Sequence, residues 1–178
     1  MTNRVYISTT STNSAQIYSN WVSVDGLESW DEVREEFSAG IYAALHQANE
    51  ELGIADSELL VTDYEGELAG VFTGSHGTFD VEGFANAQAF AGTLTDDGEE
   101  AVAAYVNYFG EWNADHFEDA WQGKWGSEQE YAEQLIEDTG MLDGVAPMVA
   151  RYFDYQAWTR DLFLDGTVYV DGNVFLSI

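Results

Sequence analysis

Residues 29–53, SWDEVREEFSAGIYAALHQANEELG, carry the clearest structural signal in this chain. Ser29 followed three residues later by Glu32 is a capping box, in which two residues satisfy each other's backbone N–H groups at a helix start. Apolar side chains then recur at every third or fourth position until Gly53, at Trp30, Val33, Phe37, Ile41, Ala44, Leu45, Ala48 and Leu52. The stretch therefore predicts an amphipathic helix with one apolar face.

The opposite face of this predicted helix carries a row of acids. The row consists of Glu28, Asp31, Glu32, Glu35 and Glu36, at positions i, i+3, i+4, i+7 and i+8. Cβ atoms at such positions lie about 5 to 6 Å apart, a spacing that suits side chains standing in for phosphates. The simpler interpretation is a solvated face, because acids in the first turn of a helix favour the helix dipole.

The whole chain contains 33 Asp and Glu against five Lys and Arg, which gives a net charge of −28. Each like-charge pair at i,i+4 costs about 0.2 to 0.5 kcal/mol, and ordinary surfaces reduce that cost by interspersing basic residues. The lack of compensation indicates that something other than stability favours this surface. We expect phosphate-mimicking, partner-binding carboxylates in the first row and in four further clusters: Asp63, Glu65 and Glu67; Asp96, Asp97, Glu99 and Glu100; Asp115, Glu118 and Asp119; and Glu130, Glu133 and Glu137.

This charge also restricts the class of partner. A strongly acidic surface repels nucleic acid and anionic membranes, and it is attracted to a protein with a basic groove. Duplex DNA carries one charge per ~1.7 Å of axis, so 28 charges correspond to roughly 48 Å, or about 14 base pairs. The chain can therefore pass electrostatically for a piece of DNA. The alternative is an ordinary halophilic protein, which spreads its acids over all faces to stay hydrated at high salt.

The composition predicts a folded protein. Hydrophobic residues make up 46% of the chain and aromatic residues 15%, which excludes the disorder that high net charge otherwise favours. A single proline and no long Gly/Ser tract predict subdomains packed directly on one another. No cysteine is present, so disulfides and thiol chemistry are excluded. The N-terminus lacks an apolar signal-peptide core, and we expect a cytoplasmic protein.

Local patterns predict an α+β fold with a helical middle and short antiparallel sheets. Strands are expected at 4–8, 17–24 and 59–62, helices at 85–91, 99–109, 114–122, 128–138 and 145–164, and a hairpin at 167–176. Asp171-Gly172 suits the type I′ turn of that hairpin, and Ser127 with Glu130 suits a further capping box, as does Asp96 with Glu99. The expected subdomains are 1–66, 67–107 and 108–178, of which the second is mainly helical.

No motif for catalysis, a metal or a cofactor stands out. The three histidines, His46, His76 and His116, lie far apart and match no ligand spacing. A pair of carboxylates for glycoside hydrolysis can be chosen at will among so many acids, so that enzyme class has no specific support. We therefore expect a protein that is not an enzyme and that holds neither a cofactor nor a metal.

Several segments together resemble the ArdA family of antirestriction proteins, DNA mimics carried by bacterial mobile elements. They are 61–66, 121–132 and the aromatic-rich 151–163, followed by 172–175. Together with 141–149, the third segment resembles the antirestriction motif of that family. The motif residues that we single out are Met141, Leu142, Val145, Met148, Val149, Tyr152, Phe153, Asp154 and Tyr155.

The resemblance implies an elongated chain of three small α/β subdomains that forms a homodimer and occupies the DNA-binding groove of type I restriction-modification enzymes. It implies no catalysis. The apolar density of 141–163 exceeds what one short helix buries, which also favours a dimer interface; alternatively these side chains fill a core with Val168, Val170 and Phe175. Charge mimicry is generic, so another DNA-binding defence protein or a nucleoid protein stays open as the target.

Overall fold

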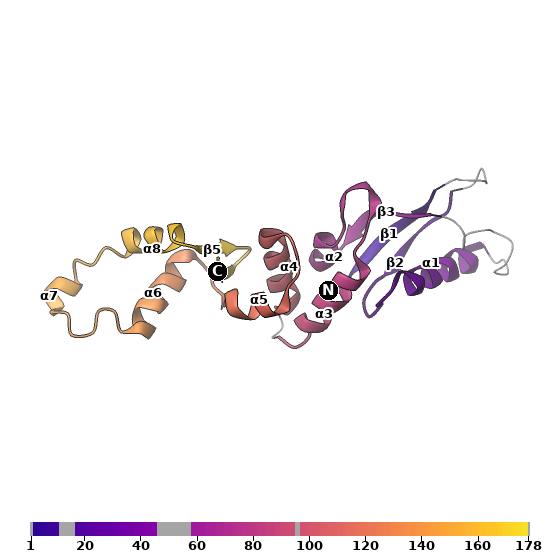
Figure 1. Cartoon of the computed structure of the whole chain (residues 1–178). Coiled ribbons are helices and arrows are strands. Elements are labelled where there is room, and N and C mark those ends of the chain that lie inside the picture. Colours follow the sequence, from indigo (N-terminus) through magenta and orange to yellow (C-terminus); the bar gives the residue numbers. More distant parts are fainter. Residues whose placement is uncertain (1, 11–16, 46–57, 95–96, 178) are drawn as a thin grey trace. The chain divides into compact units, whose positions relative to one another are not determined.

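The computed structural model describes residues 2–10, 17–45, 58–94 and 97–177 (Figure 1). The described residues form eight α-helices and two three-stranded antiparallel sheets, which confirms the predicted mixture of helix and sheet. The chain divides into two compact units, Met1–Ala103 and Ala104–Ile178. The expected division into three subdomains, 1–66, 67–107 and 108–178, stays a prediction.

The first unit contains a sheet with the strand order β2-β1-β3. Its strands are β1 (Arg4–Thr9), β2 (Ser19–Ser23) and β3 (Leu59–Glu65), at or near the positions that the sequence predicts. In β1 the side chains alternate, so that Val5 and Ile7 are fully buried while their neighbours are half-buried. This alternation gives the sheet one apolar face.

Helix α1 (Trp30–Leu45) contributes Val33, Phe37 and Ile41 to the same core, as its apolar spacing predicts. The capping box forms in a modified version. The Ser29 hydroxyl accepts a hydrogen bond from the Glu32 N–H at 3.3 Å, and the Glu32 carboxylate accepts the N–H of Glu28, at 2.6 Å, in place of that of Ser29. The predicted continuation of this helix to Gly53 lies outside the described residues.

Three more helices begin in the first unit: α2 (Glu67–Val71), α3 (Val81–Ala91) and α4 (Gly98–Phe109). A short 3₁₀ turn, η1 (Ser75–Gly77), lies between α2 and α3. Helix α3 begins four residues before the predicted start, because the Asp80 carboxylate accepts the N–H of Gly83 at 2.9 Å and caps it. Helix α4 matches the prediction closely and contains the boundary between the two units.

The second unit combines helices with a sheet of order β4-β6-β5. Its further elements are α5 (Ala114–Ala120), β4 (Trp121–Lys124), α6 (Glu128–Thr139), α7 (Pro147–Ala150), α8 (Tyr155–Leu164), β5 (Thr167–Val170) and β6 (Asn173–Leu176). Tyr105, only 1% exposed, forms the centre of the core. The rings of Phe109, Trp112, Phe117 and Phe175 surround it, with centroids 4.7 to 5.9 Å away.

Two helix predictions in this unit are partly wrong: one predicted helix ends earlier than expected, and another is interrupted in its middle. The helix predicted to reach Gln122 ends at Ala120, because Trp121 pairs with Phe175 across the sheet and its indole N–H donates to the Asn173 side chain at 3.1 Å. The stretch 145–164 is two helices, because the Asp154 carboxylate accepts the N–H of Ala157 at 2.9 Å and starts α8 anew.

The C-terminal hairpin of β5 and β6 is confirmed. Asp171 and Gly172 have φ angles of 48° and 83°, the positive values that a type I′ turn requires at both central positions. Within the described ranges, no helix has the length and apolar character needed to cross a membrane.

The buried Tyr105 predicts a loss of stability at alkaline pH. Burial, and to a smaller extent the charge of Glu111, raise the pKa of Tyr105 above its ordinary value. A raised pKa in the folded state contributes stability that is complete below the unfolded pKa of about 10 and is lost as pH rises above it. Burial also raises the pKa of Tyr131, so two tyrosines contribute to this loss.

Replacing Tyr105 by Phe should remove part of this alkaline dependence. At pH 7 the variant should lose about 1 kcal/mol, because the Tyr105 hydroxyl hydrogen-bonds the Nδ1 atom of His116 at 2.7 Å. Urea midpoints measured from pH 7 to about 10.5 should then fall less steeply than in the wild type. Tyr108→Phe, at an exposed tyrosine, is the control and should follow the wild type. An equally steep fall in Tyr105→Phe would contradict the prediction.

Candidate functional site

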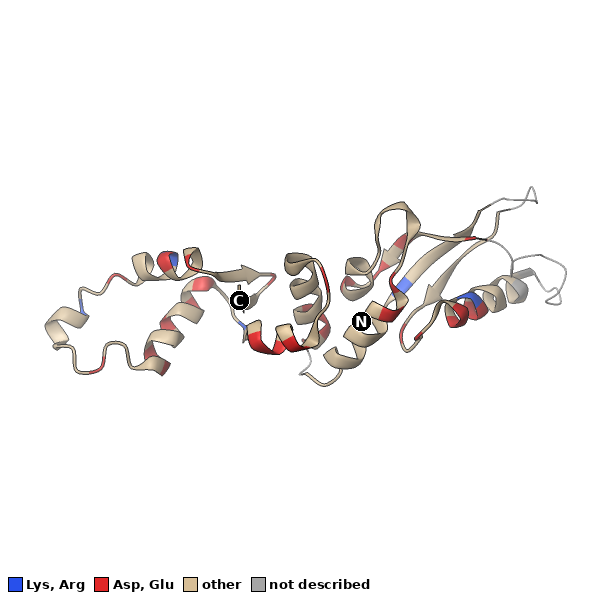
Figure 2. Ribbon diagram, in the orientation of Figure 1, with Lys and Arg blue, Asp and Glu red and all other residues tan. Residues whose placement is uncertain are grey.

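The acid row of α1 lies on the solvent side of that helix. Asp31, Glu32, Glu35 and Glu36 are all exposed, as is Glu28 just before the helix. Figure 2 marks the acids of this helix in red. Helix periodicity produces this separation, since the buried Val33 and Phe37 occupy the opposite face. The five carboxylates that the sequence places in one row therefore share one accessible surface.

This row has an energetic cost. Asp31 and Glu35, and Glu32 and Glu36, are like-charge pairs at i,i+4 on the helix, which together cost about 0.4 to 1 kcal/mol. Asp31 and Glu32 offset part of it, because both lie in the first turn, where the helix dipole favours negative charge. Glu35 and Glu36 lie beyond that turn and carry no such compensation from the dipole.

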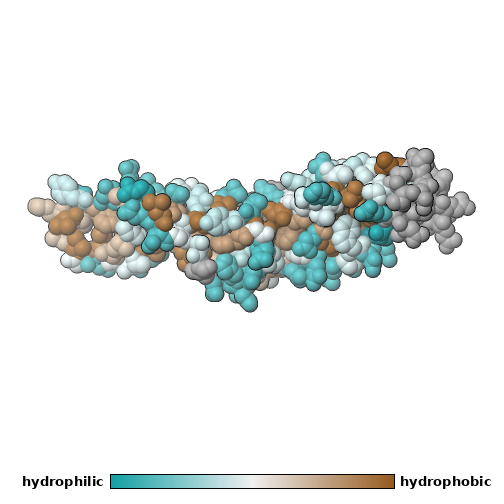
Figure 3. Space-filling view, turned by 45° about the horizontal axis from the view of Figure 1, so that its top comes forward, coloured by the Kyte–Doolittle hydropathy of each residue, from teal (hydrophilic) through white to brown (hydrophobic). Residues whose placement is uncertain are grey.

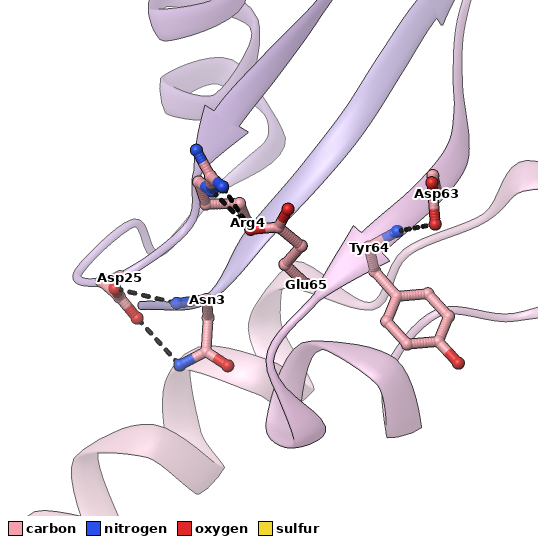
Figure 4. Close-up of polar contacts among 6 residues, drawn as sticks. All are labelled: Asn3, Arg4, Asp25, Asp63, Tyr64 and Glu65. Carbon is pink, nitrogen blue, oxygen red and sulfur yellow. Dashed lines mark hydrogen bonds and ion pairs between the residues drawn. The ribbon is translucent and has the colours of Figure 1, made fainter. Parts of the chain in front are cut away.

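The second cluster lies where β3 runs into α2. Asp63, Glu65 and Glu67 are all exposed. Glu65 forms an ion pair with Arg4 (Figure 4). The Arg4 guanidinium also lies 5.3 Å from the centre of the Trp21 ring. One of the three expected carboxylates is thus partly neutralised by a residue that sequence reasoning did not connect with it.

The third cluster lies at the start of α4. Asp97 is exposed, Glu99 and Glu100 are half-buried, and Asp96 lies outside the described residues. The Glu99 carboxylate accepts a hydrogen bond from the Asn3 side chain at 3.3 Å, and Asn3 also binds the exposed Asp25 (Figure 4). Sequence reasoning missed Asp25 because it belongs to a short turn and to no row of acids.

The remaining acid clusters belong to the second unit. The acids on α5 and α6 are red in Figure 2. All six are exposed: Asp115, Glu118, Asp119, Glu130, Glu133 and Glu137. The capping box predicted at α6 forms in a modified version, as at α1: the Ser127 hydroxyl accepts the N–H of Glu130 at 3.1 Å. The Glu130 carboxylate accepts the N–H of Gly126 at 2.9 Å, so this acid also stabilises the helix start.

An exposed apolar segment, residues 141–155, connects α6 with α8. Met148, Val149 and Tyr152 are 77%, 63% and 82% exposed, and brown side chains gather there at the left of Figure 3. The segment surrounds a hollow of about 570 Å³ lined by Leu142, Val145, Met148, Val149, Ala150, Tyr152, Phe153 and Asp154. All nine motif residues of the sequence analysis belong to this segment, and Asp154 additionally caps α8.

The described residues contain no group of three or more His, Cys, Asp or Glu arranged to hold a metal ion. His116 is engaged with Tyr105 in the aromatic core, and His76 is exposed on the turn η1. His46 lies outside the described residues. His116 lies on α5 between Asp115 and Glu118, but its ring is engaged in the aromatic core. The described residues thus offer exposed carboxylates and one apolar segment.

A family model described as antirestriction protein (ArdA) matches residues 5–175. The chain belongs to the ArdA family of antirestriction proteins. The match runs from the second residue of β1 to the third residue of β6, so it includes both compact units and the exposed apolar segment. A comparison with curated proteins returned no match. Membership of ArdA identifies the chain as an antirestriction protein.

Neutralising the acid row should leave the fold intact or stabilise it. The variant combines Glu28→Gln, Asp31→Asn, Glu32→Gln, Glu35→Gln and Glu36→Gln. Removing two like-charge pairs on the helix should gain up to about 1 kcal/mol at low salt, and screening should abolish the gain at about 0.5 M salt. Urea denaturation at both salt concentrations measures it. Arg34→Gln removes the cation of this helix and should lower the free energy of unfolding at low salt. A clear loss of stability in the fivefold variant would contradict the argument.

Proposed function

We propose that this ArdA protein inhibits type I restriction-modification enzymes by mimicking duplex DNA and occupying the DNA-binding groove of their methyltransferase core. The observation that carries the proposal is the set of exposed carboxylate rows in a chain of net charge −28. Membership of the antirestriction family supports the direction of the effect, which is protection of DNA from restriction. The place of action is the cytoplasm of a bacterial cell.

The mechanism is competition for basic residues. A groove that binds DNA is lined with Lys and Arg and holds the phosphates at one charge per ~1.7 Å of duplex axis. Carboxylates about 5 to 6 Å apart on a helix face present a comparable density of negative charge to those residues. Because each exposed ion pair contributes only about 0 to 1 kcal/mol, inhibition depends on many contacts, and no bond is made or broken.

The halophilic alternative has less support. A surface that serves only hydration gains nothing from large exposed apolar side chains, yet Met148, Val149 and Tyr152 are among the most exposed residues of their kind in the described chain. A different basic target, such as another DNA-binding defence protein or a nucleoid protein, would bind through the same carboxylates. The competition experiment below therefore also tests displacement of DNA from a nucleoid protein.

The protein should displace labelled duplex DNA from a purified type I methyltransferase core. Its affinity should fall steeply between about 50 and 500 mM salt, because many charge contacts are screened together. The fivefold variant of the acid row should compete less well, while each single Glu→Gln change should cost less than about fivefold. Equal competition at both salt concentrations, or abolition by one substitution in a folded protein, would refute distributed mimicry. Equal displacement of DNA from a nucleoid protein would favour the alternative that the protein inhibits DNA-binding proteins other than type I enzymes.

We further propose that the exposed apolar segment 141–155 is a homodimer interface. Its side chains lie outside the aromatic core around Tyr105, which argues against their use as core filling. Association of two copies would remove this apolar surface from water, a gain of about 25 cal/mol for each Å². It would also join two acidic surfaces, with charge equal to roughly 28 base pairs of duplex.

Val149→Asp should abolish this dimer. A carboxylate in an apolar interface loses its hydration without gaining a partner, and the chain is already strongly negative. Light scattering at micromolar concentration should give twice the 19.7 kDa chain mass for the wild type and the chain mass for the variant. Leu164→Asp, at a 78% exposed leucine outside the segment, is the matched control and should stay dimeric. A monomeric wild type, or a dimeric Val149→Asp, would place the proposal in error.

A further inference from the structure

Tyr64, near the end of β3, is a large aromatic residue that remains 48% exposed. It pairs with the buried Val5 of β1, whereas Arg4 and Glu65 form the next pair along the two strands. Successive side chains of a strand lie on opposite faces of the sheet, so the Tyr64 ring lies on the face away from the Arg4 ion pair. Figure 4 shows the ring pointing away from Arg4 and Glu65.

One face of this ring is covered by the backbone of α2. A Cβ atom at Gly70 would lie 2.7 Å from the Cε2 atom of Tyr64 and 3.2 Å from both its Cδ2 and Cζ atoms. An approach along the ring plane would leave the two outer atoms much farther away than the middle one, so the Cβ atom would stand above the ring. The ring therefore lies flat on α2 at Gly70, and its exposed part includes the other face.

Gly70 fixes the ring at a cost to the helix. Glycine inside a helix is less favourable than alanine, because it loses more backbone freedom on folding. At position 70 only glycine leaves room for the ring, since any Cβ atom would be too close to it. A ring held in this way presents its outward face in a constant position, so a partner that binds there orders little further side chain.

The surroundings of the ring favour a cation. Glu67 lies three positions before Gly70, so both residues share one face of α2, and the Glu67 side chain is exposed. The face of an aromatic ring carries partial negative charge and attracts guanidinium and ammonium groups, most often that of arginine. Tyr64 and Glu67 thus offer an aromatic face and a carboxylate on the same surface.

The chain itself contains an arginine bound by these two kinds of group. The Arg4 guanidinium lies 5.3 Å from the centre of the Trp21 ring and forms an ion pair with Glu65. This contact, on the opposite face of the same sheet, uses an aromatic ring and a carboxylate together. It indicates which class of side chain fits the surface formed by Tyr64 and Glu67.

We propose that Tyr64 is an arginine-binding residue for inhibition: a guanidinium group of the partner's basic groove stacks on the outward face of its ring and binds the Glu67 carboxylate. The inference rests on the proposed function and goes beyond charge mimicry, because a neutral ring adds no negative charge. The planar guanidinium of arginine stacks on rings and pairs with carboxylates, which favours arginine over lysine.

The first test compares two tyrosines of nearly equal exposure in the displacement of labelled duplex DNA from a type I methyltransferase core. Tyr64→Leu removes the ring but keeps an apolar side chain over α2, and it should weaken displacement about tenfold. Tyr64→Phe keeps the ring and should stay within twofold of the wild type. Tyr108→Leu, at a 47% exposed tyrosine of α4, is the matched control and should also stay within twofold. Equal losses in the two leucine variants would overturn the proposal.

The second test separates the ring contact from the charge contacts. Salt screens exposed ion pairs more than it screens a close, partly buried contact. The loss in Tyr64→Leu should therefore change less than twofold between about 50 and 200 mM salt, whereas the loss in the fivefold acid-row variant should shrink. A loss in Tyr64→Leu that shrinks to the same extent would show a charge effect and refute the ring contact.

A third variant keeps the proposal testable if Tyr64→Leu does not fold, which circular dichroism and urea midpoints determine. Gly70→Ala keeps Tyr64 but displaces its ring, and alanine favours the helix. Displacement of DNA should weaken at least threefold in this variant. Unchanged displacement would show that the fixed ring is not used.

The two proposals fail in different ways. If the wild type does not displace the DNA, the proposed function is wrong and the role of Tyr64 in it falls as well. If the wild type displaces the DNA while Tyr64→Leu matches Tyr108→Leu, the proposed function stands and only the arginine-binding role is refuted.

Discussion

Repulsion among carboxylates is the constraint on which this structure depends. With 33 acids and five Lys and Arg, every packing contact forms against the mutual repulsion of the surface. Exposure reduces that repulsion, because two unit charges 4 Å apart interact by about 1 kcal/mol in water and several times more in the interior. Among the described acids none is fully buried, and no buried polar side-chain atom there lacks a hydrogen bond. The acids therefore remain where water and salt screen them.

Small aromatic cores make folding possible under this constraint. A buried aromatic side chain removes about 150 to 250 Å² from water, so a few rings stabilise as much as a larger number of aliphatic residues. Phe72, Phe79 and Phe84 pack together in the first unit, and the rings around Tyr105 do so in the second. The acids also contribute locally, since Asp80 and Asp154 cap helices that would otherwise begin with unpaired N–H groups.

What the sequence predicts well depends on local chemistry, and what it misses depends on distant partners. The start of α1, the capping box of α6 and the Asp171-Gly172 turn follow from short motifs whose geometry is fixed within a few residues. Strand β4 escapes such reasoning because Trp121 becomes a strand residue only through pairing with Phe175, far along the chain. The same holds for the acids: their exposure follows from helix periodicity, whereas the pairing of Glu65 with Arg4 and of Glu99 with Asn3 joins residues 61 and 96 positions apart.

These two contacts illustrate how an acid-rich chain can be ordered without losing its charge. Arg4 holds Glu65 by cancelling part of its charge. Because the chain has only five Lys and Arg, few acids can be held in this way. Asn3 and Gln88 hold Asp25 by donating amide N–H groups, which costs no net charge. Asn173 accepts the indole N–H of Trp121, so amides also make long-range contacts in the second unit. A protein that acts through its negative surface gains order from neutral donors, because each lysine or arginine used for that purpose removes one charge from the surface.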